Sequence, residues 1–319
     1  MRTEKRKKKK KRKVLKIVGI FFLLFLAAGG VYAYSVYDSL KTAVSTMQGT
    51  DHTSDKREGK IEFKEKDPFS VLILGVDERA NDSGRSDTMI VMTVNPQKES
   101  VEMLSIPRDT RTEIVGNGTT EKINHAYARG GIKMSIATVE NFLDIPIDYY
   151  VKMNMDGFKD IVDAVGGVTV ENEATIYHNG KEYAQGTLTL NGEDALIYSR
   201  IRKGPNAGGD FGRQKRQRQV ISAIINKGAS LSSLTNYDEI FKALGKNVET
   251  NLSFDEMMDI QINYKTAVKN MEQYTIEGDG QYIGSLWYLI VPEEERMKTQ
   301  NRIKEHLGLP AVTNSAQLH

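Results

Sequence analysis

Short apolar runs and helical periodicities alternate along the 319 residues of the chain. Three apolar runs, at 69–76, 88–94 and 101–106, are each ended by turn residues and predict short strands. A polar loop at 78–86 and a tight turn at 95–98 connect them. The three strands are therefore expected to form an antiparallel meander.

Strands and helices continue to interleave after this meander. We expect strands at 149–153, 168–170 and 282–291, and helices at 133–143, 156–165, 213–227, 236–244, 254–269 and 292–307. This alternation favours an α/β fold over an all-β or all-α fold. The specific expectation is a layered α-β-α domain around a central mixed sheet.

One long apolar segment precedes the predicted domain. Residues 17–37 carry no charge over 21 positions, which matches the ~20 residues that a membrane-spanning helix needs. A cleaved signal peptide is the alternative, but its apolar region is usually about 7–15 residues and the small-residue site at 31–33 is poor. We therefore predict one uncleaved signal-anchor helix at 17–37.

The charges beside this segment predict its orientation. Residues 1–16 hold eleven Lys or Arg and one Glu, so the other residues carry 33 basic and 41 acidic side chains, a balance of −8. Because basic flanks stay in the cytoplasm, we expect a cytoplasmic tail at 1–16 and a single-pass type II cell-membrane protein. A polar extracellular stalk at 38–66 and an extracellular domain at 67–319 would follow. A nucleic-acid-binding arm is a weaker interpretation of the tail, because the spanning segment follows at once.

Several kinds of chemistry are absent from the sequence. The chain has no cysteine, which excludes disulfides, thiolate metal sites and a cysteine nucleophile. It also has no Walker loop, no Gly-x-Gly-x-x-Gly fingerprint and no Ser-His-Asp ordering. Nucleotide binding by these loops and serine-hydrolase chemistry are therefore not expected.

Two carboxylates fall at the same end of the predicted meander. Asp77 closes the first strand and Asp87 opens the second, with Arg79 and Arg85 in the loop between them. Such a pair suits Mg²⁺ serving a phosphate, since this ion is usually held by one or two carboxylates with waters and phosphate oxygens. Turn capping or ion pairing with arginine explains the same spacing equally well. Arg108 and Asp109, directly after Pro107 at the end of the third strand, would join this group.

The segment 198–220 concentrates basic residues within an acidic domain. Helical spacing places Arg213 and Gln217 on the same face as 220, 221 and 224, so they extend the core-facing stripe. An inward guanidinium needs a partner, and a bound phosphate would supply one. Lys215 and Arg218 are expected on a solvated face, with Arg216 intermediate. An ordinary amphipathic helix with a basic first turn is the alternative. The basic residues are Arg200, Arg202, Lys203, Arg213, Lys215, Arg216 and Arg218, with Asp210 as the one acidic residue among them.

An ordered series of motifs resembles the LytR-CpsA-Psr family of membrane-anchored cell-wall enzymes. The motifs cover roughly 68–230, and no family motif is found in the last 80 or so residues. They are Leu74-Gly75-Val76-Asp77, Arg85-Ser86-Asp87-Thr88, Ser105-Ile106-Pro107-Arg108-Asp109, Lys122-Ile123-Asn124-His125-Ala126-Tyr127, Val162-Asp163 through Gly166-Gly167-Val168, Leu190-Asn191-Gly192, and Asp210-Phe211-Gly212-Arg213 with Arg216-Gln217.

The resemblance implies a phosphotransferase of cell-wall assembly. It would move a glycopolymer, such as wall teichoic acid, from a polyprenyl-pyrophosphate carrier to a peptidoglycan sugar hydroxyl as a phosphodiester. Asp77 and Asp87 would hold Mg²⁺, with Mn²⁺ as an alternative ion, and Asp109 or Asp210 would accept the proton. An apolar tunnel would take the polyprenyl chain. Residues implied to bind the pyrophosphate are Arg85, Arg108, Arg200, Arg202, Arg213 and Gln217, with Arg79, Lys122 and Arg216 as further candidates.

Two other functions remain as alternatives. With water as acceptor, the same site would be a polyprenyl-pyrophosphate phosphatase. A transcriptional attenuator would use the basic residues to bind nucleic acid, but those on the helix would lie outside the membrane and the domain is net acidic. Nucleic acid is therefore not expected as a partner.

Overall fold

A mixed six-stranded sheet forms the centre of the protein. The structure, a computed structural model, describes residues 30, 32, 34–78, 84–230, 244–245 and 247–311. The sheet has the strand order β11-β6-β1-β2-β3-β12. Most of the predicted spanning segment, Arg79 and most of the helix predicted at 236–244 lie outside the described residues.

The predicted meander is confirmed and forms the middle of the sheet. Strands β1 (Phe69–Val76), β2 (Ser86–Asn95) and β3 (Ser100–Ser105) pair antiparallel in that order. The outer strands give the sheet its mixed character, because β6 (Tyr149–Met153) runs parallel to β1 and β12 (Asn270–Thr275) runs parallel to β3. Strand β11 (Val248–Thr250) closes the β6 edge in antiparallel orientation.

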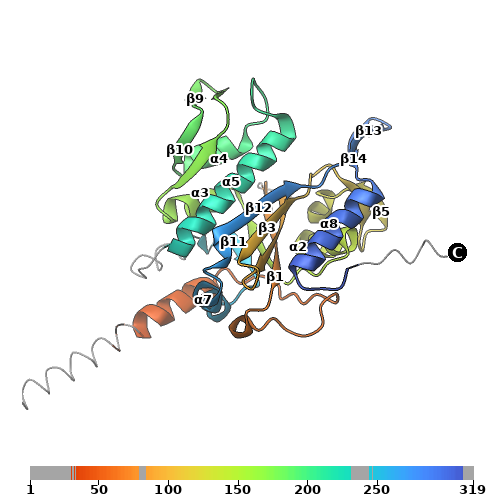
Figure 1. Cartoon of the computed structure of the whole chain (residues 1–319). Helices are drawn as coiled ribbons and strands as arrows, with labels where there is room; N and C mark the ends of the chain where they lie inside the picture. Colours follow the sequence, from red (N-terminus) through yellow and green to blue (C-terminus); the bar gives the residue numbers. More distant parts are fainter. Residues whose placement is uncertain are drawn as a thin grey trace, which may run out of the picture.

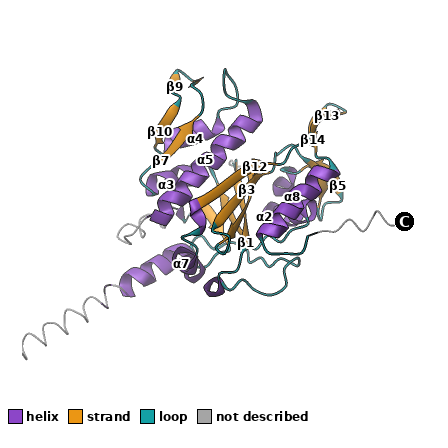
Figure 2. Ribbon diagram, viewed as in Figure 1, coloured by secondary structure: helices purple, strands orange, loops and turns teal. Residues whose placement is uncertain are grey.

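Helices cover both faces of this sheet, which explains why β1 is apolar at successive positions. Leu72 and Leu74 pack toward α2 (His125–Leu143) and α8 (Glu293–His306). Val71 and Ile73 belong to the opposite cluster, which α5 (Gly209–Ser230) and α7 (Phe254–Asn263) cover. Successive side chains of a strand point to opposite faces, so a doubly covered strand has no polar face. Figures 1 and 2 show the two layers of helices.

A smaller lobe stands beside one end of the sheet and has its own core. Its helices are α3 (Met155–Ala164), α4 (Gly192–Arg200) and the first half of α5. Two hairpins complete it, one of β7 (Val168–Asn172) with β10 (Gly186–Leu190), the other of β8 (Ile176–His178) with β9 (Lys181–Tyr183). Figure 2 shows the lobe separated from the main sheet by the line of α5.

Two predictions in the C-terminal part are wrong in detail. The strand expected at 282–291 is a hairpin of β13 (Asp279–Ile283) and β14 (Leu286–Ile290), because a turn at Gly284 and Ser285 reverses the apolar run. The helix expected at 254–269 ends at Asn263 and is followed by the short helix η3 (Ala267–Lys269). A further hairpin, β4 (Arg111–Ile114) with β5 (Thr119–Lys122), follows β3.

The predicted stalk at 38–66 is also wrong, because these residues pack on the domain. Residues 34–45 are helical, and Leu40 and Val44 pack against Phe254 at the start of α7. Further along, Phe63 in the short helix η1 (Phe63–Glu65) packs edge-on against Phe69 and joins the sheet core. The few apolar residues of this segment are spaced so that they meet the domain.

None of the helices in the described part of the chain is long and apolar enough to cross a bilayer.

Candidate active site

Most of the predicted site residues line one pocket between the end of the sheet and the smaller lobe. The pocket has a volume of about 370 Å³. Strands β1 and β2, the segment after β3, and helices α3, α4 and α5 all contribute to its wall. Of the residues singled out from the sequence, the lining includes Asp77, Asp87, Arg108, Arg200, Arg202, Lys203, Arg213 and Gln217.

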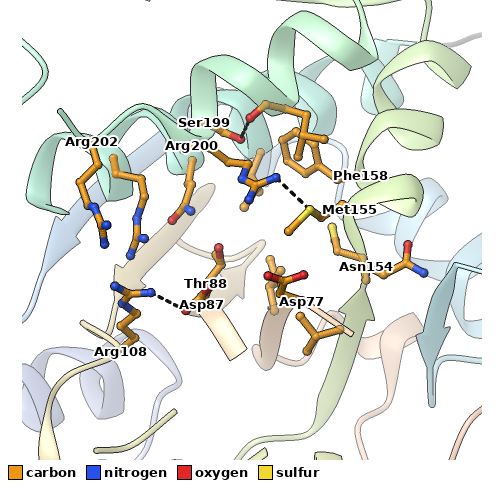
Figure 3. A pocket seen from close by; sticks show the side chains of 18 of the residues that line it. Asp77, Asp87, Thr88, Arg108, Asn154, Met155, Phe158, Ser199, Arg200 and Arg202 are labelled. Carbon is orange, nitrogen blue, oxygen red and sulfur yellow. Dashed lines mark hydrogen bonds and ion pairs between the residues drawn. The ribbon is translucent and has the colours of Figure 1, made fainter. Parts of the chain in front are cut away.

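The β1–β2 hairpin brings the two carboxylates to the same side of this pocket. The Asp77 amide donates to the Arg85 carbonyl at 3.2 Å, which closes the end of the hairpin. A Cβ at Gly84 would lie 2.6 Å from the Asp77 carbonyl oxygen, so only glycine allows this close approach. Figure 3 shows both carboxylates directed into the pocket. Arg85 is exposed and does not line it.

Arg108 faces these carboxylates from the end of β3. Its Nη1 donates to Asp87 Oδ1 at 2.6 Å, and its Nε lies 3.7 Å from Asp109 Oδ2. Burial lowers the pKa of Arg108, but the hydrogen bond and charge of Asp87, with the charges of Asp109 and Asp210, raise it overall above its ordinary value. The guanidinium is therefore firmly cationic and fixed in direction.

Arg213 enters the pocket from the first turns of α5, as the helical face predicted. The residue is 7% exposed, and its Nη2 lies 2.8 Å from Asp210 Oδ1. Burial, followed by the nearby charges of Arg108 and Arg202, lowers the pKa of Arg213 against the opposing effect of Asp210. Its Nε has no hydrogen-bond partner among the described residues. A bound anion would relieve both the mutual repulsion and the unsatisfied donor.

Arg200 and Arg202 leave much of their donor capacity free. Arg200 Nη1 donates to the Met155 thioether sulfur at 2.9 Å, a weak acceptor (Figure 3). Neither arginine forms an ion pair with a residue that the structure describes. Gln217, one helical turn after Arg213, completes the cationic side of the lining.

The other part of the lining is apolar, and the sequence did not predict which residues form it. Met155 and Phe158 of α3 lie on the side of the pocket away from Arg108 and Arg202 (Figure 3). Ile73, Val76, Met153, Leu196 and Ile221 add apolar surface. Their apolar character and spacing fit a buried core equally well. The lining thus combines a charged part with an apolar part, and Arg200 contacts Met155 where the two meet.

Four polar residues of the lining were also missed. Ser199 and Thr88 are direct neighbours of Arg200 and Asp87, so adjacency to a predicted site residue could have found them. Asn154 caps α3 by accepting a hydrogen bond from the Gly157 amide at 2.8 Å, a local role that hides its position at the pocket. His178 comes from β8, and nothing in its sequence surroundings points to the site.

Several predicted residues lie outside the lining. Asp210 is held by Arg213 and by the Gln214 amide, and Asp109 is held by Lys122 Nζ at 2.6 Å. Lys122 therefore forms an ion pair with Asp109 and does not line the pocket. Arg216 is buried and donates to the backbone carbonyls of Tyr198, Ile201 and Ala207.

Arg218 corrects the expected solvated face. It is 6% exposed and donates to Ser105 Oγ at 2.6 Å and Thr275 Oγ1 at 2.7 Å. Burial lowers its pKa to about 10. The prediction failed because α5 is covered on more than one side, by β3 and β12 as well as by the smaller lobe. Lys215, by contrast, is exposed and pairs with Glu173.

The carboxylates of the pocket suit a metal that takes few protein ligands. Among the residues that the structure describes, no group of three or more His, Asp or Glu side chains could hold a metal ion. Asp77 and Asp87 are two carboxylates in one lining, which fits Mg²⁺ completed by water and phosphate oxygens.

Comparison with known proteins assigns the chain to a family. Residues 33–305 match the LytR_cpsA_psr family. The polyisoprenyl-teichoic acid–peptidoglycan teichoic acid transferase TagU of Bacillus subtilis (strain 168) is 48% identical over 307 residues, which are 96% of this chain and 99% of that protein.

Solved structures agree with the sequence comparison. The crystal structure of B. subtilis TagU is 48% identical, with a TM-score of 0.64, and the match covers 78% of this chain and 100% of that one. A structure of TagT bound to LIIa-WTA is 33% identical, with a TM-score of 0.70, over 82% of this chain and 99% of that one. The chain belongs to the LytR_cpsA_psr family.

Proposed function

We propose that the chain transfers wall teichoic acid from a polyprenyl-diphosphate carrier to a sugar hydroxyl of peptidoglycan. The observation that carries the proposal is the mixed lining of the pocket, which combines four arginines and two carboxylates with an apolar wall. A lipid diphosphate has the same division, because a charged group is joined to an isoprenoid chain. The names of the relatives, which are teichoic acid transferases, support this substrate and this acceptor.

The arginines would hold the diphosphate from two sides. Arg108 approaches from the end of β3, while Arg213 approaches from α5 and Arg200 and Arg202 from the end of α4. Guanidinium–phosphate contacts are charge-assisted and directional, so several of them fix the diphosphate in one orientation. The first isoprenoid units would lie against Met155 and Phe158.

The reaction would proceed by direct displacement at phosphorus. The acceptor hydroxyl oxygen forms a bond to the phosphorus that carries the polymer, the bond from this phosphorus to the bridging oxygen breaks, and polyprenyl monophosphate leaves. The hydroxyl proton is lost to solvent or to a base. Such transfer depends mainly on positioning and on stabilising charge, which the arginines supply.

We assign Asp109 and Asp210 to positioning and not to proton transfer. Asp109 holds Lys122 and lies 3.7 Å from Arg108 Nε, while Asp210 lies 2.8 Å from Arg213. Neither carboxylate lines the pocket. Each one fixes the direction of an arginine that does.

We propose Mg²⁺ as the cofactor, with Mn²⁺ as a substitute, held by Asp77 and Asp87. When bound, the ion would neutralise charge on the diphosphate oxygens. Arg108 keeps Asp87 in place through their 2.6 Å hydrogen bond. We expect Asp77→Asn and Asp87→Asn to lose most metal-dependent transfer, whereas Glu173→Gln, an exposed carboxylate of the smaller lobe, should retain it. Full activity in either aspartate variant would refute the metal assignment and favour a turn-capping role for both residues.

One experiment tests the reaction against its hydrolytic alternative. The full chain in detergent is incubated with polyprenyl-diphosphate-linked teichoic acid precursor, peptidoglycan and Mg²⁺, and the products are identified by mass spectrometry. We expect polymer joined to peptidoglycan through a phosphodiester, together with polyprenyl monophosphate. Free polymer phosphate without ligation would indicate the phosphatase instead, and an unchanged precursor would refute both.

We further propose that 17–37 anchors the chain in the cell membrane with the pocket on the outer side. The basic tail before this segment supports that orientation. External protease added to intact cell-wall-free cells should then degrade the domain and spare the tail. Protection of the domain until the cells are lysed would refute the orientation.

A further inference from the structure

The β13–β14 hairpin exposes four large apolar side chains in one place. The exposed fraction is 72% for Tyr282 and 37% for Trp287, with Ile283 and Leu286 also exposed beside the turn. Every residue of β13 is exposed. Clustered aromatic exposure on a soluble surface marks an interaction site more often than single exposed residues do.

The register sorts these side chains onto two faces. Tyr282 lies opposite Trp287, and Ile283 lies opposite Leu286, so the aromatic pair shares one face and the aliphatic pair the other. On the aromatic face, a Cβ at Gly280 would lie 2.9 Å from Trp287 Cζ2. The indole therefore rests directly against the backbone of β13. The absence of a side chain at Gly280 makes room for a fixed, outward-facing aromatic surface.

The base of the hairpin is joined to the pocket. The Leu289 amide donates to the Asp109 carbonyl at 2.9 Å, and Leu289 forms a parallel bridge with Thr110. Tyr288 lies under Lys122, whose Nζ is 5.8 Å from the ring centre. Asp109 directly follows Arg108, which lines the pocket, and Trp287 is two residues from Leu289, or about 7 Å along the strand. The aromatic surface is therefore anchored to the segment that carries Arg108.

We infer that Tyr282 and Trp287 form a binding surface for the glycan strand of peptidoglycan, the acceptor in the proposed reaction, on which this inference rests. Aromatic rings offer a flat apolar face together with a polar edge, and the C–H faces of sugar rings stack on such faces. A strand held here would have its hydroxyls delivered toward the pocket along β14.

Charge distinguishes this occupant from the transferred polymer and from a lipid surface. Residues 277–290 include Glu277 and Asp279 and no basic residue. A polyanionic teichoic acid or an anionic bilayer would be repelled, whereas the sugar backbone of peptidoglycan is uncharged. The hairpin also lies at the opposite end of the molecule from the helix at 34–45, which leads toward the predicted anchor (Figure 1).

A second copy of the chain fits the hairpin poorly. A stable protein interface buries about 800 Å² on each partner, and two aromatic and two aliphatic side chains at the end of a two-stranded arm do not provide this area. The strand and its turn are also narrow, which suits a linear ligand better than a flat protein surface.

Trp287 is the one tryptophan of the chain, so tryptophan fluorescence reports on this surface alone. Soluble glycan strands, released from peptidoglycan and free of teichoic acid, are titrated into the full chain in detergent. We expect a saturable change in emission, weakened about tenfold in Tyr282→Ala. The matched control is Ile262→Ala, which removes an exposed apolar side chain from α7 on another part of the surface.

Transfer kinetics provide the second measurement. Trp287→Ala and Tyr282→Ala should each raise the peptidoglycan concentration needed for half-maximal transfer by about tenfold, which corresponds to about 1.4 kcal/mol. The maximal rate and the dependence on lipid-linked precursor should stay as in the unmodified chain and in Ile262→Ala. Circular dichroism would verify that the variants are folded.

The outcomes separate this inference from the proposed function. Normal acceptor dependence in both aromatic variants, with no response of Trp287 to glycan, would overturn the inference while leaving the transferase intact. A response of Trp287 to phospholipid vesicles, or a dependence of its emission on protein concentration, would also overturn it in favour of a membrane or a second copy. Glycan binding without any transfer would support the surface and refute the proposed reaction.

Discussion

Helix α5 carries buried arginines with two different roles, one at the pocket and two within the protein interior. Arg213 has one carboxylate partner, an Nε without a hydrogen bond among the described residues, and like charges nearby. Arg216 donates to three backbone carbonyls. Arg218 donates through Nη1 to two hydroxyls, but its Nε, like that of Arg213, has no hydrogen-bond partner among the described residues. All three are buried, so burial alone does not distinguish a binding residue from a structural one. The difference lies in where each guanidinium is placed, since Arg213 lines the pocket whereas Arg216 and Arg218 donate to groups inside the protein.

The surroundings of the helix explain this difference. Arg213 faces the pocket, whereas Arg216 points into the smaller lobe, with its guanidinium carbon 5.7 Å from the centre of the Tyr198 ring. Arg218 points to the ends of β3 and β12, where Ser105 and Thr275 lie opposite each other in register. Five substitutions would test the contrast, and they are taken in order of decreasing effect.

Arg216→Ala should cause the largest loss of stability. The substitution leaves three buried carbonyls without their donor, and the loss of a buried charged partner costs about 3–5 kcal/mol. Urea denaturation followed by circular dichroism would measure the free energy of unfolding. A change below 1 kcal/mol would show that water replaces the guanidinium easily.

Arg213→Ala should reduce transfer while leaving stability nearly unchanged. The lost charge-assisted contact to the diphosphate corresponds to about 1.5–3 kcal/mol, or roughly ten- to a hundredfold in rate. Salt at about 0.15 M has a Debye length of about 8 Å and screens exposed charges, but it screens buried contacts much less. Because the contact of Arg213 is sheltered, the loss of rate should persist at moderate salt. Gln217→Ala should have a smaller effect in the same direction. Initial transfer rates at two salt concentrations test both.

Arg218→Ala should destabilise the protein by about 2 kcal/mol. Two hydrogen bonds to a charged donor are lost, but removal of a buried charge with a lowered pKa offsets part of this cost. The folded enzyme should then bind diphosphate normally, because Arg218 does not line the pocket. A loss of binding equal to that of Arg213→Ala, with unchanged stability, would contradict this division between the two arginines.

Lys215→Ala should have the smallest effect. The side chain is exposed and its ion pair with Glu173 lies on the surface. Such pairs contribute about 0–1 kcal/mol, so both transfer and stability should stay within 0.5 kcal/mol of the unmodified chain. A rate loss similar to that of Arg213→Ala, removed by salt, would show that overall basic charge controls binding.

The sequence predicted the fold best for the central strands of the sheet, which are covered by helices on both faces. The apolar runs of β1, β2 and β3 have one structural interpretation, and all three strands are confirmed. The hairpin at Gly284 was missed because apolar residues flank the turn on both sides and the whole run was interpreted as one strand, although the Gly284-Ser285 pair is itself a turn signal. Residues 38–66 were misjudged because polar composition does not reveal that a few spaced apolar side chains dock.

The site was predicted where charge is unusual and missed where it is not. Asp77, Asp87, Arg108 and Arg213 could be grouped from strand ends and helical spacing, and the structure brings them to one pocket. Phe158 and Met155 carry no such signal, because an apolar pocket wall and an apolar core have the same pattern. Arg218 was misplaced for a different reason. Helical spacing predicts which residues are buried only when a helix has one buried side, and α5 is covered on more than one side.

The docked segment before the domain restricts how the enzyme could work at a membrane. Leu40 and Val44 hold the helix at 34–45 against α7, and Tyr37 donates a hydrogen bond to Asp255 at 2.7 Å. If residues 17–37 anchor the chain as proposed, this packed helix would fix both the height of the pocket above the membrane and the direction of its opening. The enzyme would then meet its lipid substrate in one orientation, because both diffuse in the plane of the membrane. The long polymer would reach different parts of the cell wall.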